Sequence, residues 1–402
     1  MSPETDSDDP GASAIWRFLR VTVLVLVVLL VAFLAGGGWY FSGQIHADGL
    51  EVKPYADENN LVLTPGPRST VSIEVSDATE QTMLAAPSTF GITWDGGYGQ
   101  VSGPVVKAHG DVVVRHFVVL AGVPPEKDST ANLEVAAFPD DPRFSLGLTA
   151  SEVEVKAPLG TFPAWFVPGQ TSPQDTWAVL VHGKGGNRAE MYRMGRDTVA
   201  GGLPTLDITY RNDEGLPNDP SELYQFGRTE WRDLAAAVDY AAAHGAKRVV
   251  LGASSMGGGI VASYLRHRKA GEGPEVVGLV LDSPMLDFGE TVRFGASQLE
   301  VPVLGHVPGV LTWSAQALAA QRYDLDWDAL DYLSDTSWLT MPALVFHGTA
   351  DTTVPISTSR DLAAQHSSAV TLVVTKGAEH VRSWNADPAG YDTAMKQFLD
   401  DL

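Results

Sequence analysis

Residues 252–259 of the chain read GASSMGGG, and they follow a short β-branched run, KRVVL, at residues 247–251. The apolar residues 260–265 continue as a helix, so a strand meets a helix at a serine. A turn this abrupt needs small neighbours, because a Cβ would collide with the reversing backbone, and Ala253 and Gly257 are small. The serine hydroxyl is therefore predicted to stand exposed at a helix N-terminus whose N–H groups can hold an oxyanion. A glycine-rich loop without chemistry is the alternative.

The glycine spacing selects Ser255 as the candidate nucleophile. Ser255 has Gly257 two residues later and Ala253 two residues earlier, which gives the pattern A-x-S-x-G. Ser254 would have Met256 at the later position. The only departure from G-x-S-x-G is the methyl group of Ala253.

Composition narrows the class of protein. The 402 residues exceed one ordinary domain, and a hydrophobic content of 44% excludes wholesale disorder. A formal net charge of −22 argues against nucleic acid as a partner. Because the chain has no cysteine, disulfides, thiol catalysis and thiolate metal sites are excluded.

The N-terminus predicts a membrane helix. Residues 21–41 carry no charge and would span about 31 Å as a helix, close to the ~30 Å of a bilayer core. Arg17 and Arg20 precede this run, and only Lys53 follows it closely, so we expect a cytoplasmic tail at 1–20 and the rest of the chain outside the cytoplasm. The partner of this segment is then the membrane.

Two alternatives remain for this segment. The small residues 35–38 could be cut by a signal peptidase, which would make the protein secreted, but the long acidic lead-in and the length of the run favour an uncleaved anchor. A buried core helix is less favoured, because nothing amphipathic interrupts the run.

The region from 42 to 149 is predicted to be β-rich. Residues 69–75 and 111–117 alternate or are β-branched, and turn signals separate such segments. The turn WDGGYG at residues 94–99 could bind a ligand, although packing on the neighbouring domain is favoured.

From 150 to 402 the pattern predicts an α/β domain, a mostly parallel sheet with helices on both faces. Between residues 283 and 340 a mainly helical insertion is expected to overhang the serine as a cap. The predicted strands are 152–156, 162–167, 176–182, 204–209, 247–251, 276–282, 342–347 and 370–374, and the predicted helices are 188–200, 229–243, 257–268, 356–365 and 390–399.

A serine nucleophile needs a histidine base and a carboxylate that fixes the histidine tautomer. Asp351 follows the apolar run 344–346, and His380 follows the run 372–374. Both are therefore expected at the edge of the sheet where parallel strands end. The order Ser255, Asp351, His380 completes a candidate catalytic triad.

Other residues compete for these roles. Asp282 also ends a predicted strand and is a substitute acid, whereas Asp351 could simply cap a helix. His380 could be a surface histidine of a loop. Glu379 is interpreted as a solvated neighbour of the base, and His182 as a buried structural histidine.

Two backbone N–H groups are expected to form the oxyanion hole. One belongs to Met256, and the other to Lys184 in the loop HGKGGNR at residues 182–188. The Lys184 side chain is expected to point to solvent or to the cap. The glycines lack the order of a phosphate-binding loop, and neither a metal-ligand cluster nor a dinucleotide fingerprint occurs, so no cofactor is implied.

With these motifs in order, the chain from about residue 150 resembles the α/β-hydrolase superfamily. The loop at 182–188, the elbow at 255–258 and HGTADTTVP at 347–355 are similar to a branch of membrane-linked or secreted bacterial hydrolases that includes prolyl-oligopeptidase-like relatives. The segment at 207–215 stands where many members have D-Y-R-G-x-G, but Asn-Asp-Glu replaces the usual glycines.

The resemblance implies hydrolysis of a small-molecule or lipid carboxylic ester through an acyl-enzyme. An exopeptidase or amidase, an envelope acyltransferase with the same triad, and a catalytically silent membrane-tethered binding protein remain as alternatives. In the insertion, six apolar residues indicate either an acyl pocket or a helix that packs on the sheet: Leu304, Val307, Val310, Leu311, Trp313 and Leu318.

Overall fold

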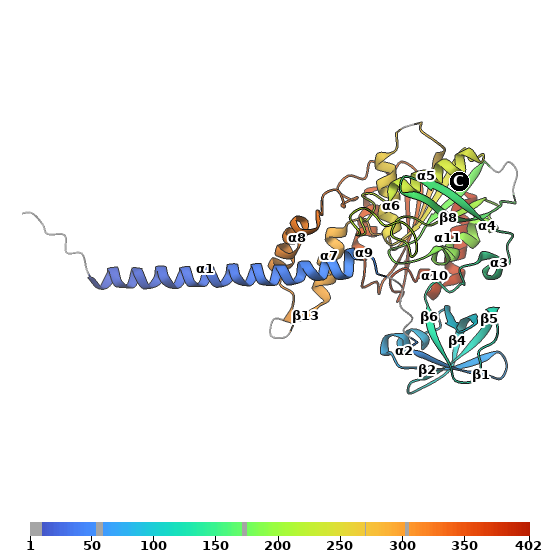
Figure 1. Ribbon diagram of the computed structural model, residues 1–402, viewed down its shortest axis with the longest axis horizontal. Coiled ribbons are helices and arrows are strands. Elements are labelled where there is room, and N and C mark those ends of the chain that lie inside the picture. Colours follow the sequence, from blue (N-terminus) through green and yellow to red (C-terminus); the bar gives the residue numbers. More distant parts are fainter. Residues whose placement is uncertain (1–9, 54–58, 171–174, 270, 302–304) are drawn as a thin grey trace, which may run out of the picture. The chain divides into compact units, whose positions relative to one another are not determined.

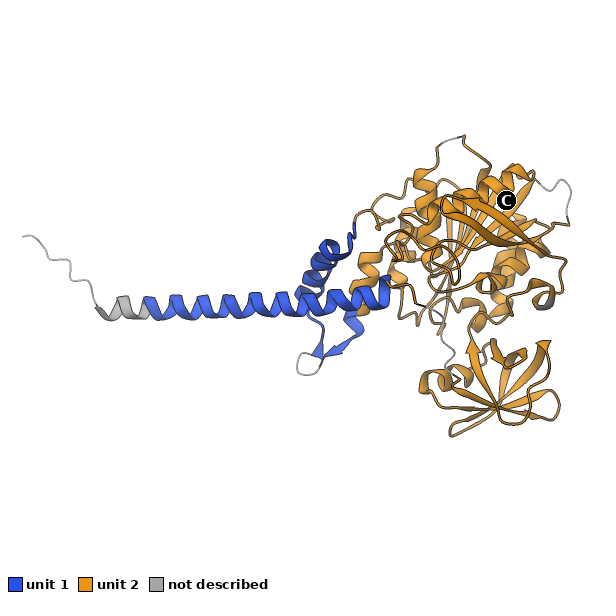
Figure 2. Cartoon of the chain, viewed as in Figure 1, with its two compact units in different colours: residues 1–50, 296–326 blue, residues 51–295, 327–402 orange. Residues whose placement is uncertain are grey.

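The computed structural model describes residues 10–53, 59–170, 175–269, 271–301 and 305–402. The chain divides into two compact units, coloured separately in Figure 2. One unit consists of residues 1–50 and 296–326, and the other of residues 51–295 and 327–402. Leu304 of the predicted cap lies outside the described residues.

The larger unit contains an eight-stranded sheet in the order β16-β15-β12-β11-β9-β10-β8-β7 (Figure 1). The pairings from β16 to β10 are parallel, and β8 and β7 are added antiparallel at the edge. This confirms the predicted α/β architecture. The strands are β7 (Ser151–Ala157), β8 (Gly160–Val167), β9 (Thr176–Val181), β10 (Thr205–Ile208), β11 (Arg248–Ser254), β12 (Glu275–Asp282), β15 (Ala343–Gly348) and β16 (Val370–Thr375).

Helices cover both faces of this sheet. Because successive residues of a strand point to opposite faces, each face presents its own set of apolar side chains to the helices. On one face Leu180 and Phe346 pack with Met194 and Tyr391, which belong to helices α4 and α11. Val179 points the other way and is also fully buried, on the face where α5 and α6 contact the central strands. The helices are η2 (Arg188–Met191), α4 (Tyr192–Ala200), α5 (Trp231–Ala243), α6 (Met256–His267), α7 (Phe288–Gln298), α9 (Ile356–Gln365), α10 (Ser383–Ala386) and α11 (Pro388–Asp400).

The β-rich region forms a closed barrel of antiparallel strands in the order β1-β2-β5-β4-β3-β6. A buried arginine, Arg115, donates hydrogen bonds to the carbonyls of Leu84, Ala86, Ser88 and Gly103. Burial lowers the pKa of Arg115 to about 10. The elements are β1 (Leu61–Gly66), β2 (Thr70–Val75), α2 (Ala78–Leu84), β3 (Phe90–Trp94), β4 (Gly97–His109), β5 (Val112–Gly122), β6 (Ser129–Glu134) and, after the barrel, α3 (Pro142–Ser145).

The turn at 94–99 does not pack as the sequence favoured. Trp94 belongs to the core of the barrel itself, where its ring lies 5.7 Å from that of Phe117. Its indole N–H donates to the carbonyl of Val123 at 3.1 Å. For Trp94 the expectation that the turn packs on the neighbouring domain was therefore wrong, because a closed barrel has an interior that buries its own large side chains.

Asn385 of α10 links the barrel region to the α/β domain. Its side-chain amide donates to the carbonyls of Thr89 at 2.7 Å and Val135 at 2.9 Å. The backbone N–H of Thr89 in turn donates to the Asn385 carbonyl at 2.8 Å. Arg193 of α4 donates to the Asn385 side-chain oxygen at 2.9 Å. These bonds are buried and fix the junction beside the loop that carries His380.

The smaller unit is built on one long helix, α1 (Pro10–Gln44). From Trp16 onward this helix is long and apolar enough to cross a membrane, and its apolar window is not buried. It is therefore no core helix of a soluble domain, whereas a membrane anchor and a signal sequence both fit. The other elements are η1 (Ile45–Leu50), β13 (Glu300–Val301), β14 (Gly305–His306) and α8 (Gly309–Tyr323).

Candidate active site

Ser255 occupies the sharp turn between β11 and α6. Its backbone has φ 48° and ψ −120°, a left-handed conformation that a residue with a side chain rarely adopts. The turn is held by hydrogen bonds from the Ser255 N–H to the Asp282 carbonyl at 3.0 Å and from the Met285 N–H to the Ser255 carbonyl at 2.9 Å. Neighbouring strand ends thus hold the serine in a strained geometry.

Gly257 explains why the elbow needs small residues. A Cβ at this position would lie 2.5 Å from the carbonyl oxygen of Val181 at the end of β9. At Gly258 it would lie 2.5 Å from the Cβ of Pro284. The start of α6 therefore packs directly against the ends of two strands, which only glycine permits.

The three side chains predicted as a triad meet in one hydrogen-bonded chain. His380 Nε2 lies 2.8 Å from the Ser255 hydroxyl, and His380 Nδ1 lies 2.8 Å from Asp351 Oδ2. Because a carboxylate only accepts, the imidazole donates from Nδ1, and Nε2 then accepts from the serine. Each residue follows a parallel strand: Ser255 follows β11, Asp351 follows β15 and His380 follows β16.

Asp351 is held as a carboxylate. Its Oδ1 accepts the backbone N–H groups of Thr353 at 2.9 Å and Val354 at 2.8 Å. Burial opposes its ionisation, but hydrogen bonds from His347, His380 and the Val354 amide outweigh burial and hold the pKa of Asp351 well below its usual range. The group remains charged at every pH at which the protein would work.

His347 is a second imidazole at this carboxylate, and the sequence did not single it out. It is fully buried, and its Nε2 lies 3.2 Å from Asp351 Oδ2 and 3.1 Å from the Val354 carbonyl. The hydroxyl of Ser359 on α9 lies 2.8 Å from its Nδ1. His347 therefore donates from Nε2 and orients the acid. Its position as the fifth residue of the otherwise apolar strand 343–348 was the only signal for this role.

The competing residues lie elsewhere in the site. Asp282 is buried at the end of β12, and burial raises its pKa to about 6. Its Oδ1 accepts a hydrogen bond from the Ser283 hydroxyl at 3.3 Å. The hydroxyl of Ser254 donates to the carboxylate of Glu190 instead of contacting His380. Glu379 pairs with Arg382.

The loop at 182–188 passes directly beside the nucleophile. A Cβ on Gly183 would lie 3.0 Å from the Cβ of Ser255. The loop closes in a tight turn in which the Gly186 N–H donates to the Gly183 carbonyl at 3.2 Å, with Gly185 at φ 65°. The side chain of Lys184 extends outward, with its Nζ 5.9 Å from the ring centre of Tyr224.

Glu190 holds this loop through a hydrogen bond to its backbone, a role that the sequence did not predict. Its Oε1 accepts the Gly183 N–H at 3.0 Å and the Ser254 hydroxyl. Burial opposes ionisation of Glu190, but Arg193, Ser254 and the Gly183 amide, among others, lower its pKa. The backbone N–H of Gly183 already donates to Glu190. The next residue along the turn is Lys184, whose backbone N–H is the predicted oxyanion donor.

Met256 supplies the other candidate donor. It is the first residue of α6, and the first N–H groups of a helix have no partner within the helix. The positive end of the helix dipole adds to the attraction of such a position for an anion.

His182 is a buried structural residue in an ion pair. Its Nε2 lies 3.0 Å from Asp213 Oδ2 and its Nδ1 lies 2.8 Å from the Gly183 carbonyl, so both ring nitrogens face acceptors. Burial lowers the pKa of His182, but Asp213 and Glu190 outweigh burial and raise it to about 9. Asp213 comes from the segment that replaces the usual glycine pattern, and Tyr210 stacks on the imidazole at 4.5 Å.

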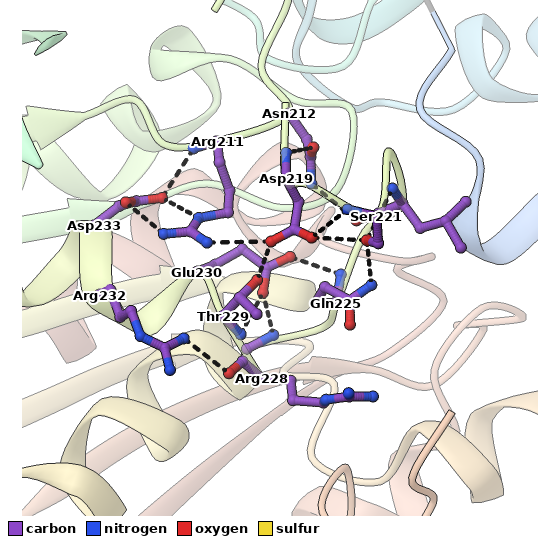
Figure 3. A network of polar contacts seen from close by, with 12 residues as sticks. Arg211, Asn212, Asp219, Ser221, Gln225, Arg228, Thr229, Glu230, Arg232 and Asp233 are labelled. Atoms are coloured by element: carbon purple, nitrogen blue, oxygen red, sulfur yellow. Dashed lines mark hydrogen bonds and ion pairs between the residues drawn. The ribbon is translucent and has the colours of Figure 1, made fainter. Parts of the chain in front are cut away.

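A buried ion-pair network fixes the long segment between β10 and α5 that carries Asp213 (Figure 3). Arg211 donates from Nε to Asp233 at 2.7 Å and from Nη1 to Asp219 at 3.1 Å. Glu230 accepts the backbone N–H groups of Gln225 at 2.7 Å and Gly227 at 2.9 Å. These buried charged groups are all hydrogen-bonded, so they hold the segment in place beside Asp213 and the loop at 182–188.

A cavity of about 750 Å³ lies on the barrel side of that loop. Its walls come from the barrel, the loop at 185–189 and the segment at 212–218, and its carboxylates are Glu134, Asp140, Asp213 and Glu214. Ser255 and His380 are not among its lining residues. Within the described part of the chain, no group of three or more His, Asp or Glu side chains has an arrangement that could hold a metal ion.

The sheet order, the strained turn after β11 and the acid and base loops after β15 and β16 together define the α/β-hydrolase fold. Among solved structures, an esterase from Pyrococcus furiosus superposes with a TM-score of 0.50 at 19% identity and covers 66% of this chain and 95% of its own. A carboxylesterase from a metagenomic library has a TM-score of 0.46 at 20% identity over 63% of this chain and 89% of its own. An esterase of Pyrobaculum calidifontis has a TM-score of 0.46 at 18% identity over 66% and 86%. No family model and no curated protein matches the chain.

Proposed function

We propose that this chain is a serine hydrolase that cleaves carboxylic esters through an acyl-enzyme. The observation that carries the proposal is the hydrogen-bonded chain from the Ser255 hydroxyl through His380 to Asp351. In the first step His380 Nε2 accepts the hydroxyl proton while the serine oxygen attacks the ester carbonyl. Asp351 holds the proton on Nδ1 and stabilises the imidazolium that forms.

The oxyanion of the tetrahedral intermediate lies between the backbone N–H groups of Met256 and Lys184. His380 then gives its proton to the leaving alcohol, which departs and leaves Ser255 acylated. In the second half His380 takes a proton from water as the water oxygen attacks the acyl carbonyl. The bond to the Ser255 oxygen then breaks, His380 returns the proton to that oxygen, and the carboxylic acid leaves. Each preorganised oxyanion donor is worth about 10²–10³ in kcat in such sites.

We further propose that α1 is an uncleaved anchor, with the tail at 1–20 in the cytoplasm and the hydrolase domain outside it. Support comes from the length and exposure of the apolar run and from Arg17 and Arg20 on its N-terminal side. The mass of the protein recovered from membranes would separate an anchor from a cleaved signal sequence.

A fluorophosphonate probe tests the catalytic proposal. We expect the full chain to be labelled and the label to be lost in Ser255→Ala but kept in Ser72→Ala, which changes a serine of barrel strand β2. The same pair is assayed with p-nitrophenyl esters of graded chain length, with and without an added alcohol acceptor. An unlabelled native protein would contradict the proposal, and a product formed only on the added alcohol would replace hydrolysis by acyl transfer.

A further inference from the structure

Helix α8 of the cap insertion packs along the N-terminal helix α1, and the packing is close. Leu311 lies so near Gly37 that a Cβ there would come within 2.7 Å of its side chain. The hydroxyl of Ser314 donates to the backbone carbonyl of Leu34 at 2.7 Å. Leu311, for which the sequence left an acyl pocket or a sheet contact open, thus packs on a helix 270 residues away in the sequence.

The contacts continue toward the end of the apolar run. The guanidinium of Arg322 lies 3.8 Å from the ring centre of Trp39 and donates to the Trp39 carbonyl at 3.0 Å and to the Ser42 hydroxyl at 2.5 Å. The rings of His46 and Tyr323 lie 4.6 Å apart and are tilted by 31°. Ser314 thus lies against Leu34 and Gly38, Arg322 against Trp39 and Ser42, and Tyr323 against His46, so the C-terminal half of α8 follows α1 toward its C-terminal end.

These contacts set the depth of α8 relative to the apolar run 21–41. Leu34 lies seven residues inside the end of the run, about 10 Å along a helix. Ser314 lies between the levels of Leu34 and Gly38, whereas Arg322 shares the level of Trp39 and Ser42, where aromatic and cationic side chains favour a membrane interface. Gly309 to Gln321 carry no charge.

The outer side of this unit is apolar and exposed. Val310 and Trp313, one helical turn apart on α8, are 57% and 70% exposed, and Leu299 just before β13 is 49% exposed. These residues continue the exposed apolar surface of α1, so the same medium that covers α1 is expected to cover them. Glu300 and His306 in the β13–β14 hairpin are exposed as well and limit insertion to the depth of the headgroups.

We propose that the exposed apolar residues Leu299, Val310 and Trp313, together with α1, form a docking surface for a lipid monolayer at the outer face of the membrane. The inference rests on the proposed orientation of α1. Since the surface has no cluster of basic residues, its attachment is apolar and does not depend on anionic lipid. The partner is the acyl boundary of a bilayer, and the cap insertion is therefore a membrane-contacting element.

The absence of cysteine allows a direct test, because one introduced thiol takes one spin label. Val310→Cys is compared with Val118→Cys, because Val118 lies on barrel strand β5 and is also 57% exposed. Both full-length proteins are placed in phosphatidylcholine vesicles, and accessibility to oxygen and to a water-soluble nickel reagent is measured. We expect the oxygen-to-nickel ratio to be several-fold higher at Val310, and Trp313→Cys, as an independent variant, to behave like Val310→Cys.

Equal ratios at Val310 and Val118 would overturn the docking proposal. So would protection of Val310 that appears only when phosphatidylglycerol is added, since the attachment would then depend on charge. Fluorophosphonate labelling of the same vesicles separates this result from the proposed function. If the protein is labelled but Val310 is accessible to water, only the docking proposal is contradicted. If the protein is unlabelled but Val310 is protected by lipid, only the proposed catalytic function is contradicted.

Discussion

Replacing Glu190 by glutamine removes the negative charge that contacts the loop at 182–188. The shape of the side chain stays almost unchanged. Glu190 accepts hydrogen bonds from the Gly183 amide and the Ser254 hydroxyl. A hydrogen bond to a charged group is worth about 1.5–3 kcal/mol and a neutral one about 1 kcal/mol. For two bonds, the loss of charge therefore costs about 1–4 kcal/mol.

Part of this free energy is expected to be lost from the stabilisation of the transition state, because the Lys184 amide, a proposed oxyanion donor, follows Gly183 in the same turn. A loss of 1.4 kcal/mol lowers the rate about tenfold, so we expect Glu190→Gln to lower kcat by roughly 10–100-fold with little change in KM. The assay is steady-state hydrolysis of p-nitrophenyl butyrate, with urea unfolding of the same samples to measure the free energy of unfolding.

Glu230→Gln is the matched control. Glu230 is fully buried and accepts the backbone N–H groups of Gln225 and Gly227, so its hydrogen bonds hold the segment between β10 and α5 and not the loop at 182–188. Its glutamine variant is expected to lose stability and to keep kcat within about twofold. If both variants lose kcat equally, or if Glu190→Gln loses stability alone, the positioning role of Glu190 is refuted.

Three further predictions follow from the same geometry. Asp351→Asn should lower kcat by about 10³–10⁴ at constant KM, because an amide favours the wrong tautomer of His380; a loss under about tenfold in steady-state kinetics would contradict this. The pKa of His182 is raised from 6.5 to about 9, so its contribution to stability is complete below pH 6.5 and is lost as the pH rises through 9. Urea unfolding should therefore show a decline between these pH values that is flatter in His182→Asn, and an unchanged slope would show that the pair with Asp213 is not formed. Arg115→Met leaves four carbonyls of the barrel, one buried and three partly buried, without their donor and should lower the free energy of unfolding by at least about 3 kcal/mol, whereas a change below about 1 kcal/mol would argue against the network.

The sequence predicted those parts of the fold that are encoded locally. A β-branched run followed by a small-residue turn predicts both a strand and the edge at which the next side chain emerges. For that reason Ser255, Asp351 and His380 could be named before any contact was known, and the structure brings them within hydrogen-bond distance. Their catalytic role remains a prediction.

Pairings between distant segments were not visible in this way. The sequence indicated a β-rich region, but barrel closure depends on Leu61 pairing with Ala131 across about 70 residues, and period-two alternation does not identify the partner strand. The distant partners of a charged residue, such as those of Glu190, are also not visible in the sequence. A glutamate just after a glycine-rich loop reads as a surface residue, because nothing local reports that Arg193 and the Gly183 amide will surround it.

The apolar residues of the insertion between 283 and 340 show a further limit of the sequence, which does not identify the partner that these residues pack against. A run such as 307–318 establishes that these side chains are covered by something apolar, but a pocket wall, a sheet and a second helix all satisfy the same pattern. What distinguishes them is the small-residue stretch at 36–38, where α8 approaches α1 closely enough for a serine to reach a main-chain carbonyl. In the sequence those glycines also fit a peptidase site, so only the position of Ser314 against Leu34 shows that they accommodate a helix.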